Sequence, residues 1–223
     1  MDVSSPLRSL VPSLDSAVLE VLAGTEAALG TTKIVHLAGR GSRTGAQKVL
    51  DRLTEHGIVL AEPTNRGHIY RLNRDHVLTP VIQYALGVRT ELFARMKDAL
   101  KQLKPTPDHA AVFGSLARAD GTPHSDIDLF LLMPAGFNPD DEWETQMRRL
   151  EDRVLAWSGN RLEVLAMDRD GLLKMIRNSE ALLDRLYADA APLIGDLRKE
   201  LAAQVTTPKE RPRRTATPMR SSL

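Results

Sequence analysis

The chain has 223 residues, of which 42% are hydrophobic and 26% charged, with a formal net charge of +1 and no cysteine. This length suits one large domain or two small ones, and we favour two. The lack of cysteine excludes disulfides and thiolate metal sites and fits a reducing compartment. No apolar run approaches the roughly 20 residues that span a bilayer, and residues 1–12 lack the basic and then apolar pattern of a signal peptide. We therefore expect a cytoplasmic protein that is not associated with a membrane.

The segment 14–72 shows the periodicity of three short helices followed by a β-hairpin. Apolar residues recur at helical spacing, and Gly24, Gly39 and Gly57 mark the ends of successive helices. The helices predicted in this way cover residues 14–22, 31–37 and 42–56. Two strands are predicted after them, over residues 58–62 and 68–72, with turn residues between them.

This order of elements resembles a winged helix-turn-helix domain. The phrase Leu50-x-x-Leu53-x-x-x-Gly57 is similar to the end of the recognition helix in bacterial winged-helix regulators. The resemblance implies that the chain binds double-stranded DNA, with the start of the third helix in the major groove and the hairpin tip near a phosphate or the minor groove. The residues expected to contact DNA are Arg43, Thr44, Gln47, Lys48 and Arg66.

The charges of this segment agree with that interpretation. Between Lys33 and Arg74 there are eight lysines and arginines against three acidic residues, a local excess that the overall balance hides. The same charges would also suit a solvated basic face, with the hairpin merely completing a small core. This alternative stays open.

A long helical pattern runs from Leu78 to about Leu103 and ends before Pro105. Gly87 and Val88 weaken its middle, so the pattern predicts either a kinked helix or two helices. Such a segment could join two domains rigidly or pair with its own copy in a homodimer.

The most informative stretch lies between residues 110 and 133. A predicted strand over residues 110–113 is followed by the small-residue turn Gly114-Ser115, a polar loop, and a second predicted strand over residues 126–133. On that second strand Asp126 and Asp128 are two positions apart, so both carboxylates project from one face. Paired acids at the start of a buried strand are costly unless something neutralises them, and a divalent cation is the usual answer.

This arrangement resembles the signature of the DNA polymerase beta-like nucleotidyltransferases, in particular their minimal branch. The residues that match the family pattern in order and spacing are Gly114, Ser115, Arg118, Ser125, Asp126 and Asp128. Ala119 departs from it, because the family commonly has glycine after the arginine. A third acid on a neighbouring strand completes the family's metal triad. Glu163 stands where it is expected, on a predicted strand over residues 161–167, and Asp168 is a nearby alternative.

The resemblance implies nucleotidyl transfer with Mg²⁺ (or Mn²⁺) as cofactor. Asp126, Asp128 and Glu163 would hold the metal, and Glu163 could accept a proton from the acceptor hydroxyl. The nucleotide-binding set would be Gly114, Ser115, Arg118 and Ser125, which would contact the phosphates of a nucleoside triphosphate. Structural roles also stay open: Asp126 and Asp128 as strand-end acids in water, and Arg118 and Glu163 as surface or ion-pair residues.

Two functions from different classes fit this sequence. The first is an enzyme that transfers a nucleoside monophosphate to a small molecule, a protein or an RNA. In this reading the winged helix would place the enzyme on nucleic acid or regulate its own operon. The resemblance to the minimal branch also implies an antitoxin-like role, in which the enzyme modifies a partner toxin protein. The second is a winged-helix transcriptional regulator whose nucleotidyltransferase-like domain senses nucleotides without catalysis.

The expected fold class is α+β: an N-terminal winged helix-turn-helix domain, a linker helix, and a C-terminal nucleotidyltransferase-type α/β domain with a small mixed sheet. After the second strand of the C-terminal domain we expect a helix over residues 141–157, a short helix over residues 170–175 and one or two more over residues 179–201. The segments expected are 1–76 for the DNA-binding domain, 77–104 for the linker helix, 105–203 for the nucleotidyltransferase domain and 204–223 for a disordered basic tail.

Overall fold

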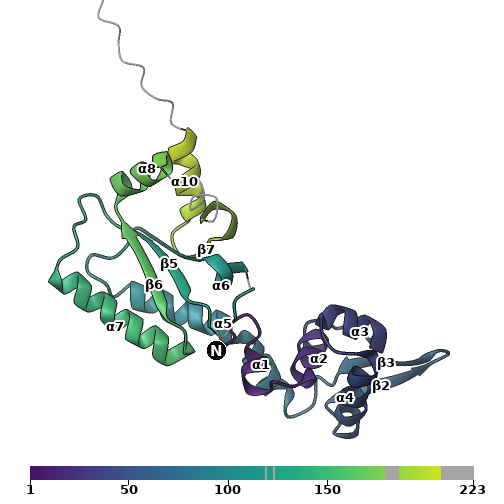
Figure 1. The fold of residues 1–223 in the computed structure, drawn as a ribbon. Coiled ribbons are helices and arrows are strands. Elements are labelled where there is room, and N and C mark those ends of the chain that lie inside the picture. Colours follow the sequence, from purple (N-terminus) through teal and green to yellow (C-terminus); the bar gives the residue numbers. More distant parts are fainter. Residues whose placement is uncertain (119, 123, 179–185, 207–223) are drawn as a thin grey trace, which may run out of the picture.

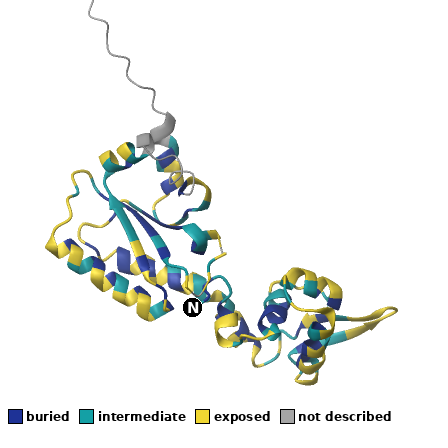
Figure 2. Ribbon diagram, in the orientation of Figure 1, coloured by how far each residue is buried: buried dark blue, intermediate teal, exposed yellow. Residues whose placement is uncertain are grey.

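A computed structural model describes residues 1–118, 120–122, 124–178 and 186–206 of the chain. It divides into two lobes that are joined through α1 (Pro6–Leu10) and α5 (Thr79–Leu100) (Figure 1). The N-terminal lobe (residues 14–72) carries a long hairpin, and the C-terminal lobe (residues 109–206) is built around a four-stranded sheet. Buried residues gather in the interior of each lobe, and the hairpin tip is exposed (Figure 2). The protein is therefore a mixed α+β structure with two small sheets.

The N-terminal lobe confirms the predicted order of three helices and a hairpin. Its elements are α2 (Leu14–Ala23), β1 (Leu29–Gly30), α3 (Thr31–Ala38), α4 (Arg43–Glu55), β2 (Val59–Thr64) and β3 (Gly67–Leu72). The strands pair antiparallel in the order β1-β3-β2. Ser42 caps α4, since its hydroxyl accepts a hydrogen bond of 3.0 Å from the Gly45 amide. Leu22, Ile34 and Leu50 are fully buried between the helices and the sheet.

The linker is a single helix, α5 (Thr79–Leu100). The sequence predicts either a kinked helix or two helices around Gly87. The prediction of two helices is wrong, because one continuous helix spans this position. Residues on both sides of Gly87 explain the continuity: Ile82 is buried in the core of the N-terminal lobe, whereas Leu92 and Met96 are buried in the core of the C-terminal lobe. Packing at both ends therefore outweighs the low helix propensity of one glycine.

The C-terminal lobe has a mixed sheet in the order β6-β5-β4-β7. Its elements are β4 (His109–Phe113), α6 (Gly114–Arg118), β5 (Ile127–Leu132), α7 (Asp141–Ser158), β6 (Leu162–Met167), α8 (Arg169–Asn178), β7 (Ala191–Ile194) and α10 (Leu197–Thr206). Strands β5 and β6 are parallel, and β4 is antiparallel to both β5 and β7.

The strands of this sheet are buried on both faces, and the alternation along β5 shows how. Leu129 and Leu131 pack toward α5 and α7, whereas Phe130 and Leu132 pack toward α8 and α10. This two-sided burial accounts for the nearly continuous apolar run in β5. It also fixes which face carries Asp128, because residue 128 shares its face with residues 130 and 132.

One strand was not predicted. Residues 179–201 were expected to be helical, but β7 occupies residues 191–194 and pairs with β4 at the edge of the sheet. Pro192 is tolerated there because an edge strand has one side without ladder hydrogen bonds. Residues 179–185 lie outside the described part of the chain. At the C-terminal end, α10 continues through residues 204–206, into the range expected to be a disordered tail, and residues 207–223 are not among those described.

The N-terminal segment contacts both lobes. It contains α1 (Pro6–Leu10). Val3 is buried in the core of the C-terminal lobe, and Leu7 is buried in the core of the N-terminal lobe. The amino nitrogen of Met1 donates a hydrogen bond of 3.1 Å to Oδ1 of Asn160. Residues 1–12, which we assigned to the first domain, thus form a second connection between the lobes beside α5.

The core of the N-terminal lobe offers a test of this packing. Leu50→Ala should lower the free energy of unfolding by about 2–5 kcal/mol, because it leaves a cavity at a side chain with no exposed surface. Leu37→Ala, at a side chain that is 50% exposed, should change it by less than about 0.5 kcal/mol. Urea denaturation followed by circular dichroism measures both. Equal effects of the two substitutions would contradict the packing described here.

Candidate functional site

The candidate site begins at the turn between β4 and α6. Gly114 has a positive φ of 72°, a conformation that side chains rarely adopt. A Cβ atom at this position would also fall onto the carboxylate of Asp128. Both the backbone angle and the close approach therefore require glycine, and they place the Gly114 backbone directly against Asp128.

Asp128 owes its place to the pairing of three strands. In the antiparallel pair β4–β5 it lies opposite Phe113, and in the parallel pair β5–β6 it lies beside Glu163. Asp128 is half-buried, whereas Glu163 is exposed. Neighbouring strands in register present such residues on one face, so Asp128 and Glu163 lie side by side on the sheet, with the glycine turn against Asp128.

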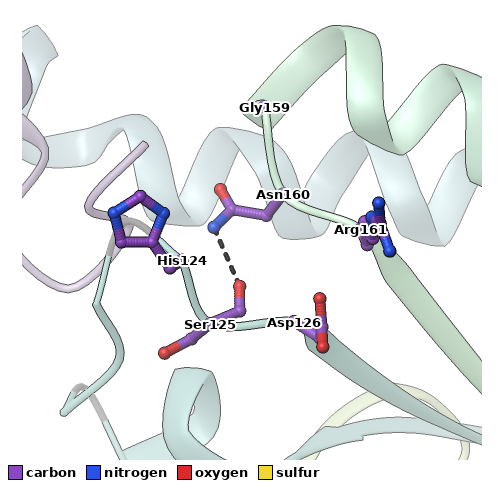
Figure 3. Close-up of a pocket in the computed structure, with 6 residues that line it drawn as sticks. All are labelled: His124, Ser125, Asp126, Gly159, Asn160 and Arg161. Carbon is purple, nitrogen blue, oxygen red and sulfur yellow. Dashed lines mark hydrogen bonds between the residues drawn. The ribbon is translucent and has the colours of Figure 1, made fainter.

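Asp126 lies just before β5 rather than within it. It lines a cavity of about 350 Å³ with residues from the preceding loop and from the turn between α7 and β6 (Figure 3). The other residues that line this cavity are His124, Ser125, Gly159, Asn160 and Arg161. Arg161 immediately precedes β6, so the cavity combines an acidic group from one strand start with a basic group from the next.

Asn160 connects the turn after α7 to the loop before β5 and to the N-terminus. The sequence alone did not identify it as a site residue. Its side chain is buried, its Nδ2 donates a hydrogen bond of 2.9 Å to the Ser125 carbonyl, and its Oδ1 accepts from Met1. In the sequence, residues 158–160 indicate only a turn. Burial of an amide in such a turn depends on the neighbouring loop, which no local pattern reveals.

Ser125, predicted to bind nucleotide, has its hydroxyl engaged within its own loop. The hydroxyl accepts a hydrogen bond of 2.8 Å from the Thr122 amide and lies 3.1 Å from the Thr122 hydroxyl. Ser115 contributes a second internal bond, since its carbonyl accepts from the Asp120 amide at 3.1 Å. These bonds shape the loop that connects the glycine turn to β5. Ala119, the departure from the family pattern, is outside the described residues.

Arg118 is held by two carboxylates. Its Nε donates to Asp120 at 3.0 Å, and its Nη1 donates to Asp189 at 2.7 Å. The hydrogen bonds to Asp120 and then Asp189 raise the pKa of the Arg118 guanidinium. Neither bond uses Nη2. Asp189 was not singled out from the sequence, because it falls in a range expected to be covering helix.

Asp168, the alternative third acid, has a structural role. Its Oδ1 accepts from the Gly171 amide at 2.9 Å at the start of α8, and its Oδ2 accepts from the Gly136 amide at 3.3 Å. It therefore caps a helix. Within the described ranges, no group of three or more histidine or acidic side chains is close enough together to hold a metal ion by itself.

Comparison with known families adds the decisive observation. Residues 94–180 match the family model of the nucleotidyltransferase domain. This part of the chain is therefore similar to a nucleotidyltransferase domain. The match includes all of the predicted catalytic and nucleotide-binding residues, and it supports an enzyme of this kind. The resemblance to nucleotidyltransferases predicted from the sequence is confirmed for this part of the chain.

Two solved structures are similar to the chain. One is a crystal structure of a mutant of the toxin-antitoxin MntA-HpeT, with a TM-score of 0.37 and 13% sequence identity over 51% of this chain and 84% of that one. The other is a crystal structure of the toxin-antitoxin with AMP-PNP, with a TM-score of 0.36 and 14% identity over the same shares. No curated protein matches the sequence.

The residues expected to contact DNA lie outside the matched residues 94–180. Arg43, Thr44 and Lys48 are exposed on α4, and Arg66 is exposed at the hairpin tip. Gln47 differs from them, because its amide is engaged inside the lobe. Its Oε1 accepts from Thr31 at 2.9 Å, and its Nε2 donates to Tyr70 at 2.8 Å and to Asp51 at 2.7 Å.

The eight cations between residues 33 and 74 fall into two groups. Four are engaged within the lobe, with carboxylates or with backbone and hydroxyl oxygens: Arg40, Arg52, Arg71 and Arg74. Four have no carboxylate partner among the residues that the structure describes: Lys33, Arg43, Lys48 and Arg66. The second group includes all three cations predicted to contact DNA.

Among the described helices, none is long and apolar enough to cross a membrane.

A pair of glycine substitutions tests the geometry of the turn. Gly114→Ala should lower the free energy of unfolding by about 1–3 kcal/mol, because it forces a strained φ and displaces Asp128. Gly87→Ala in α5 meets no atom within 4 Å and should raise it by about 0.5–1 kcal/mol. Urea denaturation of both variants measures these shifts. A Gly114→Ala protein as stable as the parent would refute the close approach.

Proposed function

We propose that the chain is a Mg²⁺-dependent nucleotidyltransferase, with Mn²⁺ as a second suitable cation, that moves a nucleoside monophosphate from a nucleoside triphosphate to an acceptor hydroxyl. We propose further that its N-terminal lobe is a winged helix-turn-helix that binds double-stranded DNA. The observation that carries the enzymatic proposal is the contact between Gly114 and Asp128 inside the matched domain. It brings a bare backbone turn and a carboxylate together at one end of the sheet.

The turn suits the phosphates of the nucleotide. Without a side chain at Gly114, the backbone amides of the turn can approach phosphate oxygens closely. The Ser115 hydroxyl adds a further donor. Arg118 Nη2, which is bonded to neither of its carboxylate partners, is available for charge that builds on the leaving pyrophosphate. The two carboxylates restrict the guanidinium, so that its binding orientation exists before the nucleotide arrives.

The donor set fits a hard divalent cation. Mg²⁺ is usually bound by one or two carboxylates together with substrate phosphates rather than by a cage of protein ligands. Asp128 supplies such a carboxylate against the Gly114 turn, and Asp126 supplies another from the cavity at the start of β5, so a three-residue cluster is not required. When bound, the cation would neutralise phosphate charge and polarise the reacting phosphorus. Glu163, exposed beside Asp128, is placed to accept the proton of the acceptor hydroxyl.

The DNA-binding proposal rests on fold and charge together. The order of helices and hairpin suits a recognition helix at α4, and three cations on α4 and the hairpin tip have no carboxylate partner in the described structure. Gln47 is better understood as a half-buried connection between α3, α4 and β3 than as a residue that contacts a base. We therefore restrict the proposed DNA-contacting set to Arg43, Thr44, Lys48 and Arg66.

Catalysis is tested by a single charge removal. Asp128→Asn keeps the shape of the side chain against Gly114 but removes its charge, so pyrophosphate release should fall by about two orders of magnitude or more. Release is measured with nucleoside triphosphates, Mg²⁺ and cell extract as the source of acceptor. Asp152→Asn, on the exposed surface of α7, should leave it unchanged. If the parent protein binds nucleotide and a specific duplex without releasing pyrophosphate, the regulator alternative is correct.

DNA binding is tested by its dependence on salt. Removing two phosphate contacts in the variant Arg43→Ala/Lys48→Ala should weaken duplex binding and reduce the slope of log K against log salt by about 1.8. Fluorescence anisotropy with a labelled duplex measures this slope. Arg71→Ala serves as the control, because Arg71 is already paired with Glu62 at 3.1 Å. Equal slopes for the parent and the double variant would show that α4 does not contact the duplex backbone.

A further inference from the structure

Asp126 and Asp128 are two residues apart, but the sheet holds them differently. Asp128 is paired on both sides, opposite Phe113 of β4 and beside Glu163 of β6. Asp126 precedes the paired part of β5, which begins at Ile127 on the β6 side and at Asp128 on the β4 side. The position of Asp126 therefore depends on what holds the loop that leads into the strand.

The turn after α7 holds the backbone on both sides of Asp126. Before it, the Ser125 carbonyl accepts a hydrogen bond of 2.9 Å from Nδ2 of Asn160 (Figure 3). After it, the Ile127 amide donates one of 2.8 Å to the Arg161 carbonyl. The second bond is made between main-chain groups, so that any residue at position 161 could supply its acceptor. The first bond comes from a side chain and therefore depends on the identity of residue 160.

Asn160 is itself fixed by α7. The helix is followed by Gly159, whose φ is 72° and whose amide donates to the Leu155 carbonyl at 2.7 Å. The Ser158 hydroxyl accepts a hydrogen bond of 3.1 Å from the Asn160 amide and donates one of 2.8 Å to the Val154 carbonyl. Ser158 and Asn160 are 3% and 4% exposed, so water competes little for these bonds. The end of a packed helix thus sets the position of Asn160.

An amide suits this place because it donates and accepts at once. Oδ1 accepts from the Met1 nitrogen at 3.1 Å while Nδ2 donates to Ser125. A carboxylate would have no proton to donate to a carbonyl, and an apolar side chain would leave the Ser125 carbonyl without this partner. The bonds between Ser125 and Thr122 are internal to the loop, so they shape it without connecting it to α7.

From these contacts we propose that Asn160 is a positioning residue, which holds Asp126 where its carboxylate binds the divalent cation. The proposal rests on the proposed nucleotidyl transfer and adds a residue to it. Mg²⁺ requires near-ideal octahedral geometry, so a displaced carboxylate binds it less well. Groups that orient a metal ligand therefore change the affinity for the metal without touching it. Loss of the Asn160 amide should weaken cation binding more than the chemistry that follows.

The binding test measures Mn²⁺ by electron paramagnetic resonance, with the full chain and the four α,β-methylene nucleoside triphosphates. These analogues supply phosphates but are not cleaved between the α- and β-phosphates. Asn160→Ala should raise the Kd of Mn²⁺ about tenfold, the lower end of what removing the partner of a metal ligand does. The control is Asp140→Ala, which removes the cap at the other end of α7. It should lower the midpoint of urea unfolding without changing this Kd.

A second variant covers a failure of Asn160→Ala to fold. Asn160→Ser keeps a polar group in the turn, but its side chain is too short to bond the Ser125 carbonyl in place of the amide. It should raise the Kd of Mn²⁺ in the same direction.

A double-mutant cycle tests whether Asn160 acts through Asp126. Asp126→Asn should itself raise the Kd of Mn²⁺, because it removes the charge of the ligand. In that background Asn160→Ala should change the Kd by less than about twofold, since no carboxylate remains there to be positioned. A residue that only stabilised the lobe would give the same fold-change in both backgrounds, and that result would overturn the positioning role.

Pyrophosphate release gives a second readout. For Asn160→Ala the Mg²⁺ concentration at half-maximal release should rise about tenfold, while the rate at saturating Mg²⁺ approaches that of the parent. Asp140→Ala should match the parent in both quantities. A rate that stays low at saturating Mg²⁺, with an unchanged half-maximal concentration, would contradict the proposal.

Two further outcomes separate this proposal from the function on which it rests. An unchanged Kd of Mn²⁺ for Asn160→Ala, with binding by the parent and a loss in Asp128→Asn, would overturn the role of Asn160 and leave nucleotidyl transfer intact. If the parent binds Mn²⁺ with none of the four analogues and releases no pyrophosphate, nucleotidyl transfer is wrong, and the positioning role is wrong with it.

Discussion

The contact between the Gly114 backbone and the Asp128 carboxylate is the constraint on which the site depends. It exists because β4 and β5 pair with Phe113 opposite Asp128, so that the turn after one strand meets the start of the other. A shift of the strands by one residue would move Asp128 to the opposite face of the sheet. The apolar residues of β5 prevent such a shift, since each of them fills a core on its own side. The hydrophobic packing of the lobe thus fixes the position of its charged site.

A second constraint joins the two lobes. The helix α5 contributes side chains to both hydrophobic cores, and the segment before α2 does the same through Val3 and Leu7. Neither core is complete without these shared elements. The arrangement differs from two domains on a flexible linker, in which the connecting residues would pack on neither side.

Much of the fold could be predicted from local patterns. The helices and the hairpin of the N-terminal lobe, the strands β4 to β6 and the nucleotidyltransferase domain were all predictable, because apolar periodicity and the Gly114-to-Asp128 motif are local properties of the sequence. Strand β7 was not, since four residues with a proline carry little strand signal and their pairing partner is about 80 residues away. The continuity of α5 was not certain either, because the contacts that hold it are tertiary.

For the candidate site, the sequence could predict which residue types are present but not which side chains they contact. Asn160 and Asp189 reach the site from distant segments, and nothing in their own surroundings marks them. Gln47 shows the converse: its position on α4 suggests base contact, yet three neighbours occupy its amide. Which groups such a side chain binds depends on the tertiary structure around it.

The 22 residues of α5 have a consequence for geometry at larger scale. At 1.5 Å per residue the helix is about 33 Å long, comparable to one turn of a DNA duplex. With each end embedded in a different core, it acts as a spacer of set length. A duplex held by the N-terminal lobe, as proposed, would then lie at a constant distance and bearing from Asp126 and Asp128 of the candidate site. Any acceptor located near that duplex would meet the enzyme at a raised effective concentration, whereas acceptors elsewhere would not.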